Sequence, residues 1–257
     1  MAIKLSTGMK QAFLKTGSVK KVLEDYVIRF YSGTPPTSAD DAATGTELVK
    51  LTLASGPWSA STAQEDYLAV TAVGSNGDTI TIALGTESHV YTKSAAETTT
   101  DAVATAVANL VNGASELCTA VASTSTTESA IIFRSKFAGE GYTINASKTG
   151  TIALSTTGNL TPVVANVRGN GLHFEAGAAV SGGVLEKESG VWSGSIAQSG
   201  VAQWWRITSN SDSGISSTTA PRIQGLCATA GSDINIPTLT FTAGAQFTLD
   251  SFSVTFA

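Results

Sequence analysis

Few side chains in this chain of 257 residues can do acid–base chemistry, since it contains two His and two Cys and only 14% charged residues. His89 lies two residues after Glu87, and His173 lies two residues before Glu175. In each pair the carboxylate could orient the imidazole as a general base. No nucleophile motif accompanies either pair, so we expect both to be ordinary strand histidines.

Metal ligands are equally sparse. Cys118 and Cys227 lack a CxxC partner, and the four His and Cys positions have no ligand spacing, so we expect no zinc site and interpret both thiols as buried. Two acid pairs, at residues 40–41 and 65–66, offer oxygen ligands for Ca²⁺ but lack the DxDxDG spacing. We interpret them as solvated turn carboxylates, with calcium as the alternative. No cofactor is expected.

A glycan hydrolase would need two carboxylates about 5–10 Å apart in a cleft. The available residues are Glu175, Glu186 and Glu188, with Trp192 as an aromatic platform. The phosphate-loop pattern GxxxxGK[ST] and the nucleophile elbow GxSxG are both missing. We therefore expect a protein that is not an enzyme. A glycan hydrolase and a carbohydrate-binding module remain alternatives.

Binding residues are easier to nominate. Trp204, Trp205 and Arg206 form the densest aromatic cluster, and neighbouring residues of a strand face opposite sides of a sheet. One Trp should lie in the core and the other outward beside Arg206. A loop or the N-terminal helices could cover the outward Trp. Alternatively it is an interface anchor, because Trp and Arg dominate binding hot spots.

The N-terminal end is basic within an acidic protein. Five lysines precede the first acid, Glu24, among them Lys10, Lys20 and Lys21. They could form a solvated helix face. The functional interpretation is an arm that docks on an acidic neighbour. We nominate Lys10, Lys20 and Lys21, with the tryptophan cluster, as interface candidates.

Whole-chain properties exclude other partners. A net charge of -5 and a pI near 5.0 do not suit a groove that tracks phosphates, so we expect no direct contact with nucleic acid. No stretch is long and apolar enough to cross a bilayer, and no secretory signal follows Lys4. We expect a chain made in a reducing cytoplasm.

The elements that must position these residues are mostly strands. Apolar periodicity predicts a helix carrying Leu5, Met9, Phe13 and Leu14 on one face, interrupted at Gly17, and a second helix capped by Ser18. Strands with turns between them indicate an antiparallel sandwich or barrel. We predict them at 27–31, 47–53, 172–174, 191–195, 204–208, 221–226, 239–241 and 246–256. The last changes parity between Leu249 and Phe252, which predicts a bulge or bend at 250–251.

The middle of the chain has a different organisation. Asn76-Gly77 predicts a hairpin between strands at 68–73 and 78–84. Thr98 and Asp101 have capping-box spacing before a helix whose Val103, Val107, Leu110 and Val111 share a face, with a stop at 112–113. Further strands are expected at 89–92, 117–121, 130–134, 142–146 and 151–154.

We therefore predict a mainly β protein, an antiparallel β-sandwich built from both chain ends with a small inserted α+β domain. The outer domain comprises residues 1–57 and 166–257 with the N-terminal helices, and the inserted domain comprises 58–165. Glycine, proline and asparagine turns flank the insert, as tolerated insertions require.

Five segments of the outer part of the chain follow one another in a recognisable order: Lys4–Gly8, Ile28–Pro36 with Ala39-Asp40, Thr44–Leu48, Gly190–Gly194 and Leu249–Thr255. Through these segments the chain resembles, over residues 1–57 and about 166–257, a family of small tailed-bacteriophage virion proteins. Members run directly from the strand at 51–53 to that at 171–174, so the middle unit is a departure. It resembles another phage module, of the kind that begins Gly77–Ile82 and occurs on heads and tails alike.

The resemblance implies a structural role in the virion and supplies no catalytic residues. We expect a decoration or cement protein that binds the major capsid protein or other virion proteins as a homo-oligomer. A tail component, such as a fibre adaptor, is the alternative. The expected location is the virion, after synthesis in the host bacterial cytoplasm.

Overall fold

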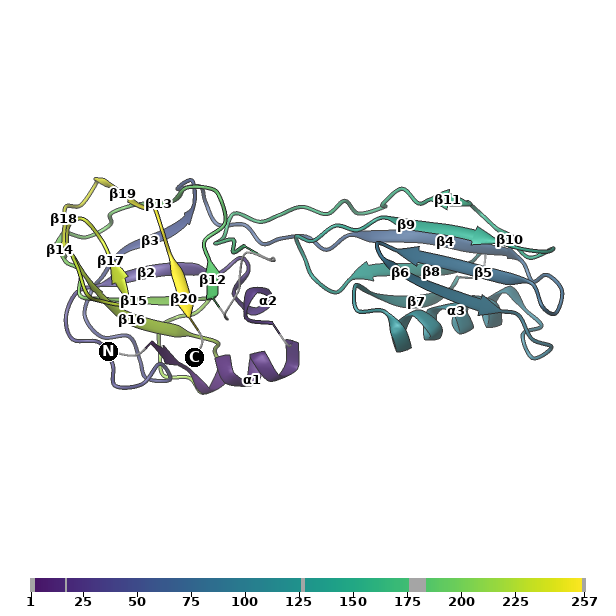
Figure 1. Ribbon diagram of the computed structural model, residues 1–257, viewed down its shortest axis with the longest axis horizontal. Coiled ribbons are helices and arrows are strands. Elements are labelled where there is room, and N and C mark those ends of the chain that lie inside the picture. Colours follow the sequence, from purple (N-terminus) through teal and green to yellow (C-terminus); the bar gives the residue numbers. More distant parts are fainter. Residues whose placement is uncertain (1–2, 17, 126–127, 176–183, 256–257) are drawn as a thin grey trace. The chain divides into compact units, whose positions relative to one another are not determined.

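The computed structural model describes residues 3–16, 18–125, 128–175 and 184–255. They form two compact units (Figure 1), unit 1 from Met1–Ala60 with Gly169–Ala257 and unit 2 from Ser61–Arg168. The fold class expected from the sequence is confirmed: the chain is mainly β, its sheets are antiparallel apart from one short parallel pair, and both chain ends build the outer unit. No helix in the described part of the chain has the length and hydrophobicity to span a membrane.

Unit 1 is built around a sheet with the strand order β1-β16-β15-β2-β3-β13-β19, in which β17 also pairs with β16. Two short pairs, β12 with β20 and β14 with β18, complete it. Its strands are β1 (Lys4–Leu5), β2 (Val27–Tyr31), β3 (Glu47–Leu53), β12 (Val184–Glu186), β13 (Trp192–Ser195), β14 (Gly200–Val201), β15 (Trp204–Thr208), β16 (Ile223–Ala228), β17 (Ile234–Asn235), β18 (Thr240–Phe241), β19 (Gln246–Leu249) and β20 (Ser253–Thr255).

The strands richest in β-branched and aromatic residues have the bounds that their sequence predicts. β2, β3 and β15 have both ends where the sequence predicts them. The first residues of β2 and β15, Val27 and Trp204, are fully buried. The predicted strand at 172–174 is different. Within the described part of the chain it forms two isolated bridges, from Leu172 to Tyr26 and from Phe174 to Lys187, and no ladder.

The core of unit 1 lies against the sheet and is aromatic. The rings of Phe30 and Phe247 meet edge to face with centroids 5.3 Å apart, and Phe174 meets Trp192 in the same way at 5.2 Å. Phe252 contacts Trp205 at 5.6 Å. Residues from both ends of the chain thus interlock in one core.

The final strand is broken where its parity changes, as predicted. β19 ends at Leu249 and pairs with β13, whereas β20 starts at Ser253 and pairs with β12. The chain therefore changes partner instead of forming a single bulge, and Phe252 still reaches the core. Phe256 lies outside the described residues.

Two helices precede β2. α1 (Thr7–Thr16) buries Met9, but Leu14 is 88% exposed, so its predicted place on the apolar face is wrong. Five residues on from Met9, Leu14 lies about 140° around the helix. α2 (Val19–Leu23) is capped by Ser18, as predicted: the Ser18 side chain accepts a hydrogen bond from the Lys21 amide. Gly17 lies outside the described residues.

Chain segments at the two borders of unit 1 lie side by side. The Leu53 amide donates to the Asn170 carbonyl at 3.1 Å, and the Asn170 amide donates to the Ser59 carbonyl at 3.0 Å. The chain therefore leaves unit 1 next to the point where it returns.

Unit 2 has two four-stranded sheets, β10-β4-β8-β7 and β11-β9-β5-β6. Figure 1 shows α3 running along the sheet that contains β7 and β8. Its elements are β4 (Glu65–Ala72), β5 (Thr79–Leu84), β6 (Glu87–Thr92), α3 (Thr100–Ala114), β7 (Cys118–Ser125), β8 (Glu128–Ser135), β9 (Ile144–Lys148), β10 (Ala153–Leu154) and β11 (Gly158–Asn159).

The predicted hairpin at Asn76-Gly77 is wrong, because β4 and β5 belong to different sheets. The turn is present, with Gly77 at a φ of 88°. The Asp78 carboxylate explains the change of direction. It accepts hydrogen bonds from the amides of Ser75, Thr151 and Ile152, and so ties the turn to the segment before β10.

The helix α3 is one residue out of phase with its predicted cap. The Thr99 hydroxyl, not that of Thr98, accepts the hydrogen bond from the Ala102 amide. Val103, Val107 and Val111 are fully buried, as expected from their spacing. The helix extends past the predicted stop, to Ala114.

Candidate functional site

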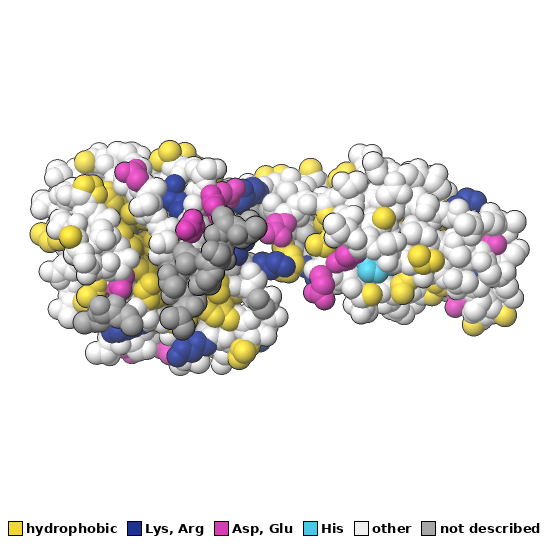
Figure 2. Space-filling view, in the orientation of Figure 1, with side chains coloured by type: hydrophobic (Ala, Val, Ile, Leu, Met, Phe, Trp, Pro, Cys, Tyr) yellow, Lys and Arg dark blue, Asp and Glu magenta, His cyan; other side chains and the backbone are white. Residues whose placement is uncertain are grey.

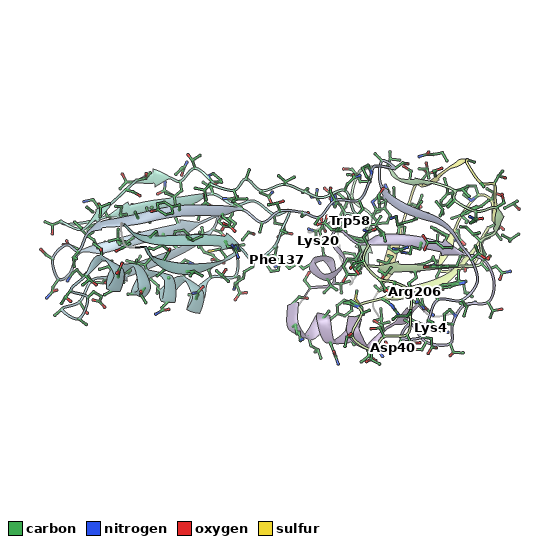
Figure 3. All side chains as sticks on the ribbon, turned by 180° about the vertical axis from the view of Figure 1, so that it is seen from behind. Lys4, Lys20, Asp40, Trp58, Phe137 and Arg206 are labelled. Carbon is green, nitrogen blue, oxygen red and sulfur yellow. The ribbon has the colours of Figure 1, made fainter. Side chains whose placement is uncertain are left out.

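The nominated tryptophan cluster is buried, so the expected outward Trp is a wrong prediction. Trp204 and Trp205 are each 0% exposed and Arg206 is 1% exposed. Trp204 stacks on Tyr31 with ring centroids 4.2 Å apart, and the Arg206 guanidinium lies 5.3 Å from the Trp204 ring. Figure 3 labels Arg206 within unit 1. In this chain the cluster is core and cannot anchor a partner.

A loop covers that face of the sheet, as the alternative to an anchor anticipated. Arg206 donates to the Asp41 carbonyl at 3.2 Å, and Gln224, which also accepts from Arg206, donates to the Pro36 carbonyl at 3.1 Å. Burial and the nearby Arg222 lower the pKa of Arg206 to about 10. These hydrogen bonds form a polar layer between the loop at 36–41 and the sheet, where we expected an exposed interface residue.

The same layer contains a buried ion pair. Arg222 is 1% exposed and holds both carboxylate oxygens of Asp212, through Nε at 2.6 Å and through one terminal nitrogen at 2.7 Å. Burial opposes the charge on Asp212, but hydrogen bonds from Arg222, Thr208 and Gly214 outweigh it and lower its pKa to about 2. This arrangement fixes the loop and leaves no group free for catalysis.

The nominated lysines fall into two groups. Lys10 is exposed on α1, near the exposed Leu14. Lys20 and Lys21 are half-buried on α2, and the Lys20 ammonium lies 3.8 Å from a carboxylate oxygen of Glu24. Only the first group presents a free basic surface. Figure 2 shows that charged side chains are scattered on one face of the molecule.

The two histidines have different neighbours. In unit 2 the Nε2 atom of His89 lies 3.2 Å from Glu87, whose other oxygen accepts the Glu116 amide. In unit 1 His173 does not meet Glu175, the partner that the sequence suggests. Its Nε2 atom lies 3.5 Å from an oxygen of Asp25. His89 is thus an ordinary strand residue, and His173 belongs to a different cluster.

We call Glu24, His173 and Glu188 the His173 cluster. One ligand atom from each lies within 4.8 Å of the others, and Asp25 borders them. Three chain segments create it. The Asp25 amide donates to the Leu172 carbonyl at 3.1 Å, and the Glu188 amide donates to the His173 carbonyl at 3.1 Å.

The backbone beside the His173 cluster is tightly specified. Asp25 has a φ of 63°, a left-handed conformation that Asp tolerates better than most residues. A Cβ at Gly171 would lie 2.4 Å from the Asp25 backbone, so only glycine allows the approach. The indole nitrogen of Trp58 donates to the Asp25 carbonyl at 2.8 Å. Figure 3 labels Trp58 and Lys20 in unit 1.

Sequence reasoning missed this cluster, because Glu24 lies 149 positions before His173 (173 − 24) and the three residues have no ligand spacing. One signal was available. The turn at Gly169-Asn170-Gly171 marks a close backbone approach, and His173 lies two residues after it. The partner segment could be found only from the fold.

The residues nominated for glycan chemistry do not come together. Trp192 is 0% exposed and packs in the core, so it cannot stack on a sugar. Glu188 lies in the His173 cluster, whereas Glu186 lines a cleft with Asp233 and Asp250. Every aromatic side chain whose burial the structure describes is buried or half-buried. This geometry gives no support to the carbohydrate alternatives.

The acid pairs are not the solvated turn carboxylates that we expected. Asp40 accepts the Thr7 amide at 2.8 Å at the start of α1, and Asp41 accepts the Ser38 amide at 2.9 Å. Glu65 pairs with Arg134. Asp66 is fully buried, and this burial raises its pKa. Each acid thus has a structural role.

Both cysteines are buried free thiols, as predicted. Burial raises the pKa of Cys118 to about 11 and that of Cys227 to about 12. Neither thiol is therefore ready to form a thiolate at neutral pH.

Comparisons of the chain with models of protein families, with curated proteins and with solved structures give no match.

Proposed function

We propose that the chain is a non-enzymatic structural protein of a tailed-bacteriophage virion, and that it decorates and cements the head shell as an oligomer. The observation that carries the proposal is where the segments of the resemblance lie. Residues 192–194 of the segment Gly190–Gly194 belong to β13, which pairs with β3 on one side and with β19 on the other. Segments far apart in the chain are thus adjacent in unit 1, as they must be if they belong to one compact body.

Several side chains that could do chemistry are buried or bound to other groups of the fold, which supports a structural role. The Asp212 carboxylate and the Arg222 guanidinium bind each other, and Asp78 binds backbone amides. Both thiols are buried. A protein that works by assembly needs rigidity from such groups and no open chemistry.

The outer face of α1 is our proposed docking surface, which we define as Lys10, Leu14 and Lys15. All three side chains are exposed, and Leu14 at 88% is the most exposed large apolar residue of the described chain. An apolar side chain between two ammonium groups suits an acidic partner surface with a small apolar depression. The major capsid protein is the partner we propose.

Cementing would work by avidity. Each copy adds a modest contact, and linkage of copies in an oligomer converts later contacts into intramolecular ones. Because the contacts form only with the assembled shell, they stabilise it by mass action.

The position and copy number of the chain on particles test this proposal. Particles of the phage that encodes the chain would be imaged by electron microscopy with the chain labelled by gold. Hundreds of copies over the head are expected. A few copies around the tail would overturn the decoration role and favour the alternative, a fibre adaptor or tail accessory protein. Absence from particles would reject both.

The docking surface is tested separately. Leu14→Asp should reduce retention of the chain on purified particles by about tenfold, the effect of losing about 1.4 kcal/mol of binding. Val121→Asp is the matched control, since Val121 is also an exposed apolar residue, at 62%, but lies on β7 of unit 2. Equal retention of the two variants would remove α1 from the interface.

A further inference from the structure

We propose that the His173 cluster is a binding site for one divalent transition-metal ion, Zn²⁺ in the first instance. The site goes beyond the proposed virion role and does not depend on it. It also departs from the expectation of no metal that the ligand spacing gave. Its ligands would be His173 Nε2 and one carboxylate oxygen each from Glu24 and Glu188, with Asp25 at the border.

His173 supplies the observation that separates this cluster from an ordinary group of acids. Its side chain is 95% buried, with 5% exposed, yet its Nε2 atom has no hydrogen-bond partner among the described residues. A buried polar atom without a hydrogen bond is costly. A ring nitrogen of the same imidazole lies within 4.8 Å of a carboxylate oxygen of Glu24 and of Glu188. A metal ion there would satisfy it.

Charge favours a cation at the same point. The carboxylates of Glu24, Asp25 and Glu188 border the imidazole, and the Lys20 ammonium lies 3.8 Å from a carboxylate oxygen of Glu24. The Lys187 ammonium is directed elsewhere, to the carbonyls of Glu188 and Gly190. Carboxylates gathered at partly buried positions favour a positive charge nearby. A divalent ion would add to the positive charge that Lys20 brings.

The donor set selects the kind of metal. Ca²⁺ and Mg²⁺ prefer oxygen ligands, whereas an imidazole nitrogen suits Zn²⁺ and its neighbours in the first transition row. Zn²⁺ binds His nitrogen and carboxylate oxygen at about 2.0–2.2 Å. Ligand atoms up to 4.8 Å apart would need to close by a small rotation of the glutamate side chains. Glutamate has the rotatable bonds to do this.

Metal binding would join three segments that the chain brings together from far apart. Glu24 follows α2, His173 follows the return from unit 2, and Glu188 precedes β13. The ion would therefore act as a structural clip within unit 1. Since binding occurs in the folded state, it would raise the stability of that unit.

Calorimetric titration of the metal-free, full-length chain with ZnCl₂ is the first test. One Zn²⁺ per chain is expected, with a rise in Tm of about 5–10 °C at a hundredfold excess over Kd. CaCl₂ and MgCl₂ should give no comparable shift. His173→Gln should weaken Zn²⁺ binding about 100-fold, whereas the matched variant His89→Gln should bind as the parent does. Equal loss in both, or none in His173→Gln, would overturn the proposal.

A second test measures Zn²⁺ binding by NMR on the parent protein, so that its outcome does not depend on whether a variant folds. The chain has only two histidines, so ¹⁵N-histidine labelling gives two imidazole spin systems, assigned with His89→Gln. Zn²⁺ should shift the ring nitrogens of His173 and leave those of His89 in place. A shift of His89 alone, of both rings equally or of neither would reject the site. Glu188→Gln should abolish the His173 shift, while Glu186→Gln, two positions away, should not.

Discussion

Unit 1 and unit 2 differ in how far along the chain their strand partners lie. In unit 1, Lys4 of β1 pairs with Gln224 of β16, so the first strand needs a partner from near the opposite end. In unit 2 every strand finds its partners within residues 61–168, and β5 and β6 are joined by a tight turn. Closure of long loops costs entropy before contacts repay it. Unit 2 therefore carries its own folding information, whereas unit 1 depends on both ends of the chain.

The two units also treat buried charge differently. Unit 1 buries the Arg222–Asp212 ion pair beneath a loop. Unit 2 satisfies the Asp78 carboxylate mainly with backbone amides from two turns. Removal of one partner from a buried ion pair leaves a charge without compensation, so unit 1 has the more vulnerable polar element.

Separating the fragments should give the largest effect. A fragment of residues 61–168 should fold alone, because it contains all the partners of its strands, with its own buried core. A fragment of residues 1–60 should remain unfolded, since β2 and β3 lose β15 and β13. Far-UV circular dichroism with thermal melting of each fragment measures this. A folded 1–60 fragment would contradict the dependence of unit 1 on both chain ends, and an unfolded 61–168 fragment would contradict the independence of unit 2.

Breaking the buried ion pair should give the next largest effect. Asp212→Ala leaves Arg222 buried without its carboxylate, which should lower the free energy of unfolding of unit 1 by about 3–5 kcal/mol. Native-state hydrogen exchange distinguishes the two units, and amides of unit 2 should keep their protection. Asp233→Ala, which removes a carboxylate that accepts only the Leu226 amide among the described contacts, is the milder control. Equal losses in the two variants would argue against a special role for the pair.

Acid should weaken both units through different carboxylates. Asp212 in unit 1 and Asp78 in unit 2 each have a pKa of about 2, below the ordinary 3.8. For Asp78, the main cause is the hydrogen bond from the Ser75 amide. A lowered pKa contributes stability above the unfolded value, and this is lost as the pH falls from about 4 towards 2. Asp78→Asn should flatten this dependence in unit 2 alone, which exchange measured across that pH range would reveal.

Loss of the hydroxyl that caps α3 should give the smallest effect, and it tests whether Thr99 or Thr98 is the cap. Thr99→Ala removes the hydroxyl that caps the helix and should cost unit 2 about 1 kcal/mol. Thr98→Ala, the position that the capping-box spacing suggested, should cost about 0.3 kcal/mol or less. Urea titration followed by circular dichroism gives both values. The reverse order would restore the cap predicted from sequence.

Local patterns predicted most of the elements. Val27–Tyr31 and Trp204–Thr208 read as strands because β-branched and aromatic residues fit a pleated surface, and each strand has the bounds expected. Alternation also implied that one of Trp204 and Trp205 faces away from the core. It could not show that a loop some 165 positions away would cover that face.

The misses share one physical origin, which is partner choice at long range. At Asn76-Gly77 the turn was predicted correctly, but Asp78 ties the chain to residues 151–152 and sends β5 into another sheet. The His173 cluster likewise depends on contact between the segments at 24–25 and 172–173. Residue types specify the local conformation in both places, and only the whole fold determines what lies opposite.

The hydrogen bonds that Asn170 makes to Leu53 and Ser59 have an evolutionary consequence. Because these bonds already hold the segments where the chain leaves and re-enters unit 1 side by side, a short turn could replace unit 2. A domain of another size could also be inserted at the same position. Unit 1 could therefore gain, lose or exchange an inserted domain without a change in the pairing of its own strands.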